Sequence, residues 1–182
     1  MLEQKPALAE PVLKGVPRMR KELCPNCGQE RLVVRTNYRF KESGVPNVLL
    51  HGIDVIRCPQ CGDSPILPNL RGLLRALSLA LIKKPVRLRG EEIRFLRKRV
   101  DKTGLEFSKL LHVDNSTLSK WENNDDPVGD QSDRLIRLLT MALDSELREE
   151  LREAVESFPA IRRRKSPMRV EIDTSELSYR YA

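Results

Sequence analysis

The chain has 182 residues, of which 32% are charged and 40% hydrophobic, and its formal net charge is +7 at pH 7. This length allows one ordinary hydrophobic core or two small ones, and the apolar content excludes a wholly disordered chain. No stretch approaches the roughly 18 uninterrupted apolar residues of a membrane-spanning helix, and the first residues lack the apolar run of a secretory signal. We therefore expect a cytoplasmic protein with no membrane partner and a flexible N-terminal tail over residues 1–22.

All four cysteines belong to two Cys-Pro-x-Cys-Gly motifs, which begin at Cys24 and Cys58. Pro constrains φ after the first sulfur and Gly tolerates a positive φ after the second, so both motifs predict the same tight turn. Two such turns can direct four sulfurs to the corners of a tetrahedron, which is the geometry of a closed structural zinc site. We predict one structural Zn²⁺ per chain, with no open position for catalysis, held by Cys24, Cys27, Cys58 and Cys61.

The cysteine spacing is also compatible with a redox pair of the thioredoxin type or with unpaired buried thiols. A redox pair normally occurs once, inside a βαβ pattern, whereas here the motif is duplicated without that pattern. His51 can in principle replace one sulfur, but four cysteines already saturate the ion. The zinc interpretation is therefore favoured.

The segment between the two cysteine pairs has the pattern of a β-hairpin. Residues 31–40 alternate with the period of a strand, Ser43 to Asn47 supply turn-forming residues, and Val48 to Arg57 form an apolar, β-branched return strand. An isolated hairpin is marginally stable in water, so the metal is expected to stabilise its base. Residues 23–68 are predicted to form this zinc-binding domain.

The next segment, 69–84, is predicted to be a linker helix that ends before Pro85, because leucines recur at helical spacing from Leu70 to Leu81. Such an apolar helix has to be covered. Either it packs against the chain's own domains, or it forms a surface for self-association or for another partner.

Residues 83–102 contain nine lysines and arginines against three acids, which indicates either a phosphate-binding surface or a solvated face. Apolar residues then mark three short helices within residues 93–121, the arrangement of a helix-turn-helix. Thr103 and Asp114 are suitable N-caps for the second and third of these helices.

The motif Ser-Thr-Leu-Ser-Lys-Trp-Glu at 116–122 resembles the xenobiotic-response-element (phage repressor-like) helix-turn-helix family. Together with the preceding cysteine motifs, the chain resembles MqsA-type antitoxins, which join a YgiT-type zinc finger to that domain, over about residues 23–143. Two positions depart from the family pattern: Gly104 replaces a Gln that contacts phosphate, and His112 replaces a Gly in the turn. The resemblance implies that Glu122 ties the third helix to the first.

The resemblance also implies an α+β fold, in which a small zinc-knuckle hairpin domain precedes an all-α helix-turn-helix domain over residues 85–158. The third helix would enter the major groove by its N-terminal end. From side-chain chemistry we predict base contacts by Asn115, Ser116, Thr117 and Lys120. Backbone contacts are predicted for Arg87, Arg89, Arg94 and Ser119.

Beyond residue 123, Leu135, Leu138, Leu139, Ala142 and Leu143 predict an amphipathic helix, and Leu147, Leu151 and Val155 predict inward positions on its continuation. A palindromic operator needs paired recognition helices, so we expect a homodimer formed through residues 124–158. Residues 159–182 are predicted to be a basic tail. Within it, 162–165 are equally consistent with a phosphate-binding arm and a solvated segment, and 169–173 alternate weakly like a strand.

The function that follows is sequence-specific DNA binding by a transcriptional repressor. By the resemblance, it would regulate its own operon and neutralise a toxin through the zinc domain. The alternative is a zinc-containing regulator or adaptor whose N-terminal domain binds a protein other than a toxin. No nucleophile with a base, carboxylate pair or phosphate loop supports an enzyme.

Overall fold

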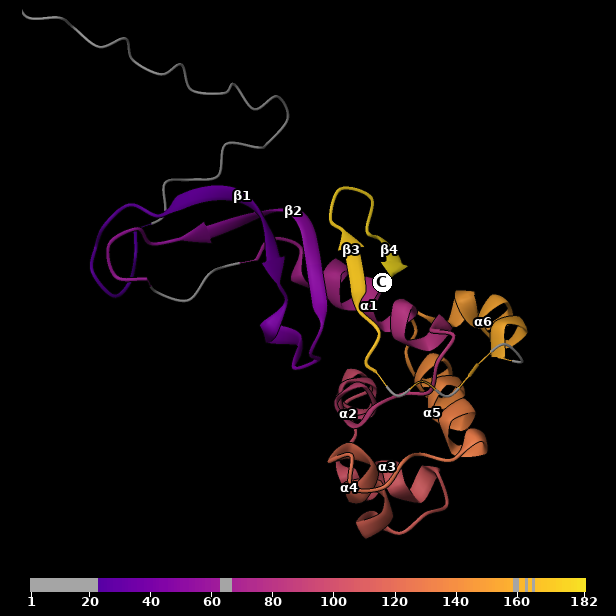
Figure 1. Cartoon of the computed structure of the whole chain (residues 1–182). Coiled ribbons are helices and arrows are strands. Elements are labelled where there is room, and N and C mark those ends of the chain that lie inside the picture. The colour runs from indigo at the N-terminus through magenta and orange to yellow at the C-terminus, as the bar shows by residue number, and fades with distance from the viewer. Residues whose placement is uncertain (1–22, 63–66, 159–160, 163, 165) are drawn as a thin grey trace, which may run out of the picture.

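The computed structural model describes residues 23–62, 67–158, 161–162, 164 and 166–182. Strands β1 (Leu32–Arg39) and β2 (Val48–Arg57) pair antiparallel and confirm the predicted hairpin. The short 3-10 turn η1 (Lys41–Ser43) joins them and ends at Gly44, which has a φ of 70°. The end of the hairpin that carries the cysteines extends away from the rest of the molecule (Figure 1).

Two more strands come from the C-terminal segment that the sequence assigns to a tail. Strand β3 (Val170–Asp173) runs parallel to β2, and β4 (Ser178–Tyr181) runs antiparallel to β3, so the sheet has the order β1-β2-β3-β4. Val170 and Ile172 are buried. The tail prediction is therefore corrected for residues 170–181, because a four-residue alternation does not reveal a partner strand about 120 residues earlier. The tail predicted over residues 1–22 lies outside the described residues.

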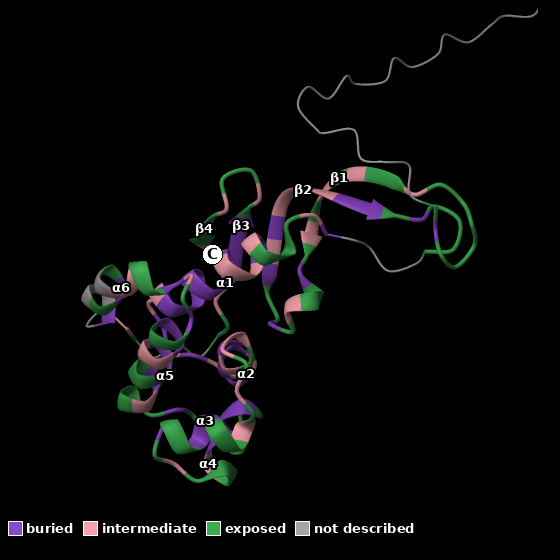
Figure 2. Ribbon diagram, turned by 180° about the vertical axis from the view of Figure 1, so that it is seen from behind, coloured by how far each residue is buried: buried purple, intermediate pink, exposed green. Residues whose placement is uncertain are grey.

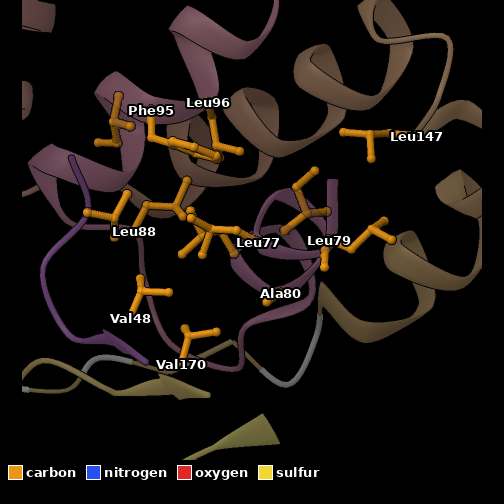
Figure 3. Close-up of a cluster of buried hydrophobic side chains, with 14 of the residues drawn as sticks. Val48, Leu77, Leu79, Ala80, Leu88, Phe95, Leu96, Leu147 and Val170 are labelled. Atoms are coloured by element: carbon orange, nitrogen blue, oxygen red, sulfur yellow. The ribbon is translucent and has the colours of Figure 1, made fainter. Parts of the chain in front are cut away.

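Helix α1 (Leu70–Lys83) forms where the sequence predicts a helix and lies between the sheet and the other helices. In Figure 3 its Leu77 lies between Val48 and Val170 of the sheet on one side and Phe95 of α2 (Gly90–Arg99) on the other. The phenolic O–H of Tyr181 in β4 donates to the carbonyl of Ala80 at 2.7 Å. The apolar face of α1 is thus covered by this chain's own sheet and helices.

The helical half continues through α3, α4, α5, the 3-10 turn η2 and α6. Helix α4 contacts both α2 and α3 at the end of the helical half away from the sheet, and α5 packs against α2 and α6 (Figure 1). One cluster of buried side chains runs from the hairpin through α1 into this half. None of the described helices has both the length and the apolar character needed to cross a membrane. Their bounds are α3 (Gly104–Leu110), α4 (Asn115–Glu122), α5 (Asp130–Leu143), η2 (Arg148–Glu150) and α6 (Leu151–Ser157).

The inward face of α5 differs from the predicted one. Ile136, Arg137 and Met141 are fully buried, whereas Leu135 and Leu143 are 37% and 44% exposed. Of the predicted leucine stripe, Leu135 and Leu143 are thus exposed, while Leu138 and Leu139 are partly buried against the core. Val155 in α6 is likewise exposed rather than inward.

Buried Arg137 accounts for this rotation. The last four carbonyls of a helix have no partner inside it, and the guanidinium of Arg137 donates to the carbonyls of Leu81, Ile82 and Lys84 at 2.6–3.1 Å. Asp133, one turn earlier in α5, accepts from Arg137 at 2.9 Å and thereby balances its charge. Satisfying the end of α1 requires this polar pair to face inward, which turns Leu135 and Leu143 outward.

Candidate metal centre and candidate nucleic-acid interface

Both cysteine motifs form the predicted turns. Gly28 and Gly62 have φ values of 71° and 65°, the left-handed conformation expected after the second cysteine. The N–H of Gly28 donates to the carbonyl of Cys24 at 2.8 Å and closes the first turn. The two motifs lie next to each other because β1 and β2 are paired up to Leu32 and Arg57.

The four sulfurs converge on one point and can hold a metal ion. All four lie within 4.8 Å of one another; Cys24 Sγ is 3.6 Å from Cys61 Sγ, and Cys27 Sγ is 3.4 Å from Cys58 Sγ. A disulfide would require about 2.05 Å, whereas tetrahedral ligation with Zn–S bonds of about 2.3 Å places sulfurs roughly 3.8 Å apart. The spacing therefore fits four ligands of one ion.

Sulfurs this close influence each other's ionisation. Backbone N–H groups of Cys61 and Gln60, together with the neighbouring thiols, lower the pKa of Cys58 to about 6. A backbone N–H of Gln29 lowers the pKa of Cys27, but hydrogen bonds with the other sulfurs and burial outweigh it and raise that pKa to about 12. Because the neighbouring sulfurs raise the pKa of Cys27, holding all four sulfurs as thiolates would require a cation among them, which is the role a metal ion would have here.

Three exposed apolar side chains lie near the metal centre. Leu23, Leu32 and Val33 are 67%, 51% and 47% exposed, and Leu23 forms an isolated β-bridge with Glu30. The sequence alone did not single them out. The sequence places these residues next to the cysteine turns. It does not predict their exposure, which arises because this end of the hairpin extends away from the rest of the molecule (Figure 1).

At the other end of the molecule, α3 and α4 are joined by the four residues 111–114. Thr103 caps α3 as predicted: its hydroxyl accepts from the N–H of Glu106 at 3.2 Å, and the Glu106 carboxylate accepts from the N–H of Thr103. His112 has a φ of 53°, so it adopts the left-handed conformation that a glycine would adopt in this turn. Asp114 is the N-cap of α4, although its side chain makes no capping hydrogen bond.

Helix α4 has one buried side and one solvent side. Leu118 and Trp121 are buried with exposed fractions of 1% and 9%, so Trp121 belongs to the core. The four predicted base-reading residues lie elsewhere on the helix, and Figure 2 colours the exposed stretches of the ribbon at this end in green. Asn115, Ser116 and Lys120 are exposed, and Thr117 is half-buried.

Glu122 ties α4 to α2 through two arginines. Its carboxylate accepts from Arg97 at 2.6 and 2.9 Å, and this bond raises the pKa of Arg97. Arg94 bonds to the same carboxylate at 3.3 Å and to its backbone carbonyl at 3.0 Å. The tie expected for Glu122 is present, and Arg94, which was predicted to contact the DNA backbone, is one of the residues that form it.

Most of the basic run at 83–102 is likewise used inside the molecule. Lys84 forms a buried ion pair with Glu92, and Arg87 pairs with Asp130. Within the described residues, six of the nine bases pair with an acid: Lys83, Lys84, Arg87, Arg94, Arg97 and Arg99. The run therefore stabilises helix contacts to a larger extent than the sequence indicated. Of the predicted backbone contacts, Arg89 is half-buried and Ser119 is exposed.

Comparisons with known proteins add no identification: no family model, no curated protein and no solved structure matches this chain.

Proposed function

We propose that the protein is a sequence-specific DNA-binding repressor without enzymatic activity, in which α3 and α4 form a helix-turn-helix of the phage repressor type. The observation that carries this proposal is the exposed surface of α4, where Asn115, Ser116 and Lys120 face solvent while Leu118 anchors the helix. Asn can bond to adenine N6 and N7, and Lys can donate to guanine O6 or N7, each contributing about 1–3 kcal/mol of discrimination.

The proposal includes a homodimer on a palindromic operator. The exposed side of α5 supports it, because Leu135 and Leu143 are more than a third exposed and Leu138, Leu139 and Ala142 complete the same helical stripe. A second copy of this chain, packing stripe to stripe, would cover these side chains and place two α4 helices on one duplex.

The metal is proposed to be one Zn²⁺ per chain, because four cysteine sulfurs at this spacing suit zinc and leave no site for water. Bound there, zinc would supply structural cross-linking of the hairpin base. The resemblance to MqsA-type antitoxins supports a toxin as the partner of this domain. The exposed Leu23, Leu32 and Val33 support a protein partner of either kind, a toxin or a protein other than a toxin.

The test is base discrimination by the Lys120→Ala variant. Selection from a random duplex library identifies the preferred site of the wild-type chain, and fluorescence anisotropy then compares that site with a scrambled duplex. We expect Lys120→Ala to reduce the ratio of specific to non-specific affinity by about 5- to 150-fold while non-specific binding changes little. An equal loss on both duplexes would contradict the assignment of the recognition surface.

A further inference from the structure

A cavity of about 430 Å³ lies between the start of α2, the end of α4 and the loop that precedes α5. Its wall is apolar, with Ile93, Trp121 and Val128, and three guanidinium-bearing residues border it. Two of these were predicted to contact DNA, and the third comes from the C-terminal segment: Arg87, Arg89 and Arg164.

Backbone hydrogen bonds fix the C-terminal segment at this place. The N–H of Arg162 donates to the carbonyl of Pro85 at 2.7 Å, and the N–H of Arg87 donates to the carbonyl of Arg162 at 3.1 Å. Val86 and Arg162 thereby form a parallel bridge. Arg164, two residues further, is exposed at the cavity. Arg163 and Lys165, which belong to the same basic run, lie outside the described residues.

Arg87 positions the rim of the cavity. Its guanidinium donates to the carbonyl of Val128 at 3.0 Å and pairs with Asp130, so it holds the loop before α5. Its Nε atom is buried and has no acceptor among the described residues. A buried N–H of this kind is costly unless an acceptor is supplied, and an anion in the cavity would add negative charge next to it.

The start of α2 packs tightly against the end of α4 beside the cavity. A Cβ at Gly90 would lie 2.5 Å from the backbone carbonyls of Trp121 and Glu122, so only glycine allows α2 to begin this close to the end of α4. The N–H of Gly90 donates to Asn124 Oδ1 at 2.8 Å and fixes the loop as well. The cavity is thus built by contacts that also set the position of α4.

The charge around the cavity contrasts with that of the helical half. Residues 85–158 contain 13 lysines and arginines against 16 aspartates and glutamates, a net charge of −3. Three arginines against Asp126 give the lining residues a net charge of +2, which the pairing of Arg87 with Asp130 lowers to +1. Asp126 also lies 3.8 Å from the ammonium of Lys120, so this aspartate opposes anion binding at both places.

We propose that this cavity binds a phosphate group of the DNA backbone, next to the bases that α4 reads, and that Arg164 makes the C-terminal segment part of the DNA-binding surface. The proposal rests on the proposed function. Arg89 and Arg164 contact the phosphate, and Arg87 positions the loop. Guanidinium groups suit this ligand because they donate in a planar fork to phosphate oxygens.

The experiment uses the full chain and a mixed-sequence duplex of about 30 base pairs, with affinity measured over a series of KCl concentrations. In the double variant Arg89→Gln/Arg164→Gln we expect the magnitude of the slope of log K against log salt to fall by about 1, because one phosphate contact is lost, and in Arg164→Gln alone we expect a smaller fall. Asp126→Asn should act in the opposite direction and tighten binding. Unchanged thermal melting curves confirm that the variants are folded.

The matched control is Arg35→Gln/Arg39→Gln, which removes the same charge from exposed positions on β1. We expect it to leave the slope unchanged. The proposal would be overturned if the cavity double variant and the β1 double variant lowered the salt slope equally, because the change would then reflect the loss of net charge alone. No change in either would overturn it too.

A second titration, with sodium pyrophosphate at constant ionic strength, distinguishes DNA from a free phosphate compound. Pyrophosphate binding that the cavity double variant loses, together with an unchanged DNA slope, would overturn DNA as the source of the phosphate. A wild-type chain that binds no duplex contradicts the proposed function itself. If base preference depends on Lys120 but the salt slope is unchanged in Arg164→Gln, the result contradicts only this inference.

Discussion

Different interactions stabilise the cysteine end and the α4 end of the molecule. At the cysteine end, Leu32 and Val33 of β1 are exposed, although Val55 and Ile56 of the paired strand β2 are buried. At the α4 end, Leu118 and Trp121 are buried and Glu122 is fixed by two arginines. The comparison teaches that four converging sulfurs supplement partial burial at the cysteine end, whereas burial and ion pairs suffice at the other.

The largest effect should follow from removing one sulfur. Cys58→Ser is expected to abolish metal binding, since the apparent free energy of structural zinc sites is about 10–16 kcal/mol and depends on all ligands. Metal analysis should fall from about one ion per chain to none. Amide exchange should rise near Leu32 and Arg57 but stay slow at Leu50, which is buried and pairs with β3.

The matched control is Ser43→Ala in the same hairpin, which should keep its metal. If Cys58→Ser also unfolded α4, the two ends would not be independent and the comparison would be wrong.

The next effect concerns the helical half. Arg137→Met should lower the free energy of unfolding by about 3–5 kcal/mol, because Asp133 would be left buried without its cation and the α1 carbonyls without donors. Chemical denaturation measures it. Arg134→Met, an exposed residue of the same helix, should change stability by less than about 0.5 kcal/mol. Similar losses in the two variants would show that Arg137 has no special role.

A smaller effect is expected at the exposed stripe of α5. Leu143→Glu should convert a dimer into a monomer without lowering the melting temperature of the monomer much, since the residue is 44% exposed. Sedimentation equilibrium provides the measurement, and Leu70→Glu, exposed at the start of α1, is the control. A wild-type chain that is monomeric at high concentration would contradict the proposed stripe-to-stripe dimer.

Local features of the sequence predicted local features of the structure. The turns at Gly28 and Gly62, the Thr103 cap and the hairpin depend on neighbours a few residues apart, and each is present. The convergence of the four sulfurs followed from the pairing of the two strands.

Features set by distant contacts were not predictable in the same way. The pairing of β3 with β2 joins residues about 120 positions apart, and a weak four-residue alternation does not encode it. The inward face of α5 is set by Arg137, which counts as polar in any periodicity analysis but is fully buried. The basic run looked like a phosphate-binding surface because its acidic partners, such as Glu122 and Asp144, lie far along the chain.

The most direct test of the central claim is selection of duplexes from a random library by the full-length chain. The account predicts enrichment of a two-fold symmetric site whose half-sites are about 10 base pairs apart, or a multiple of that distance, and loss of the enrichment in the Lys120→Ala variant. Recovery of unrelated sequences, or of the same site by wild-type and variant chains alike, would contradict it.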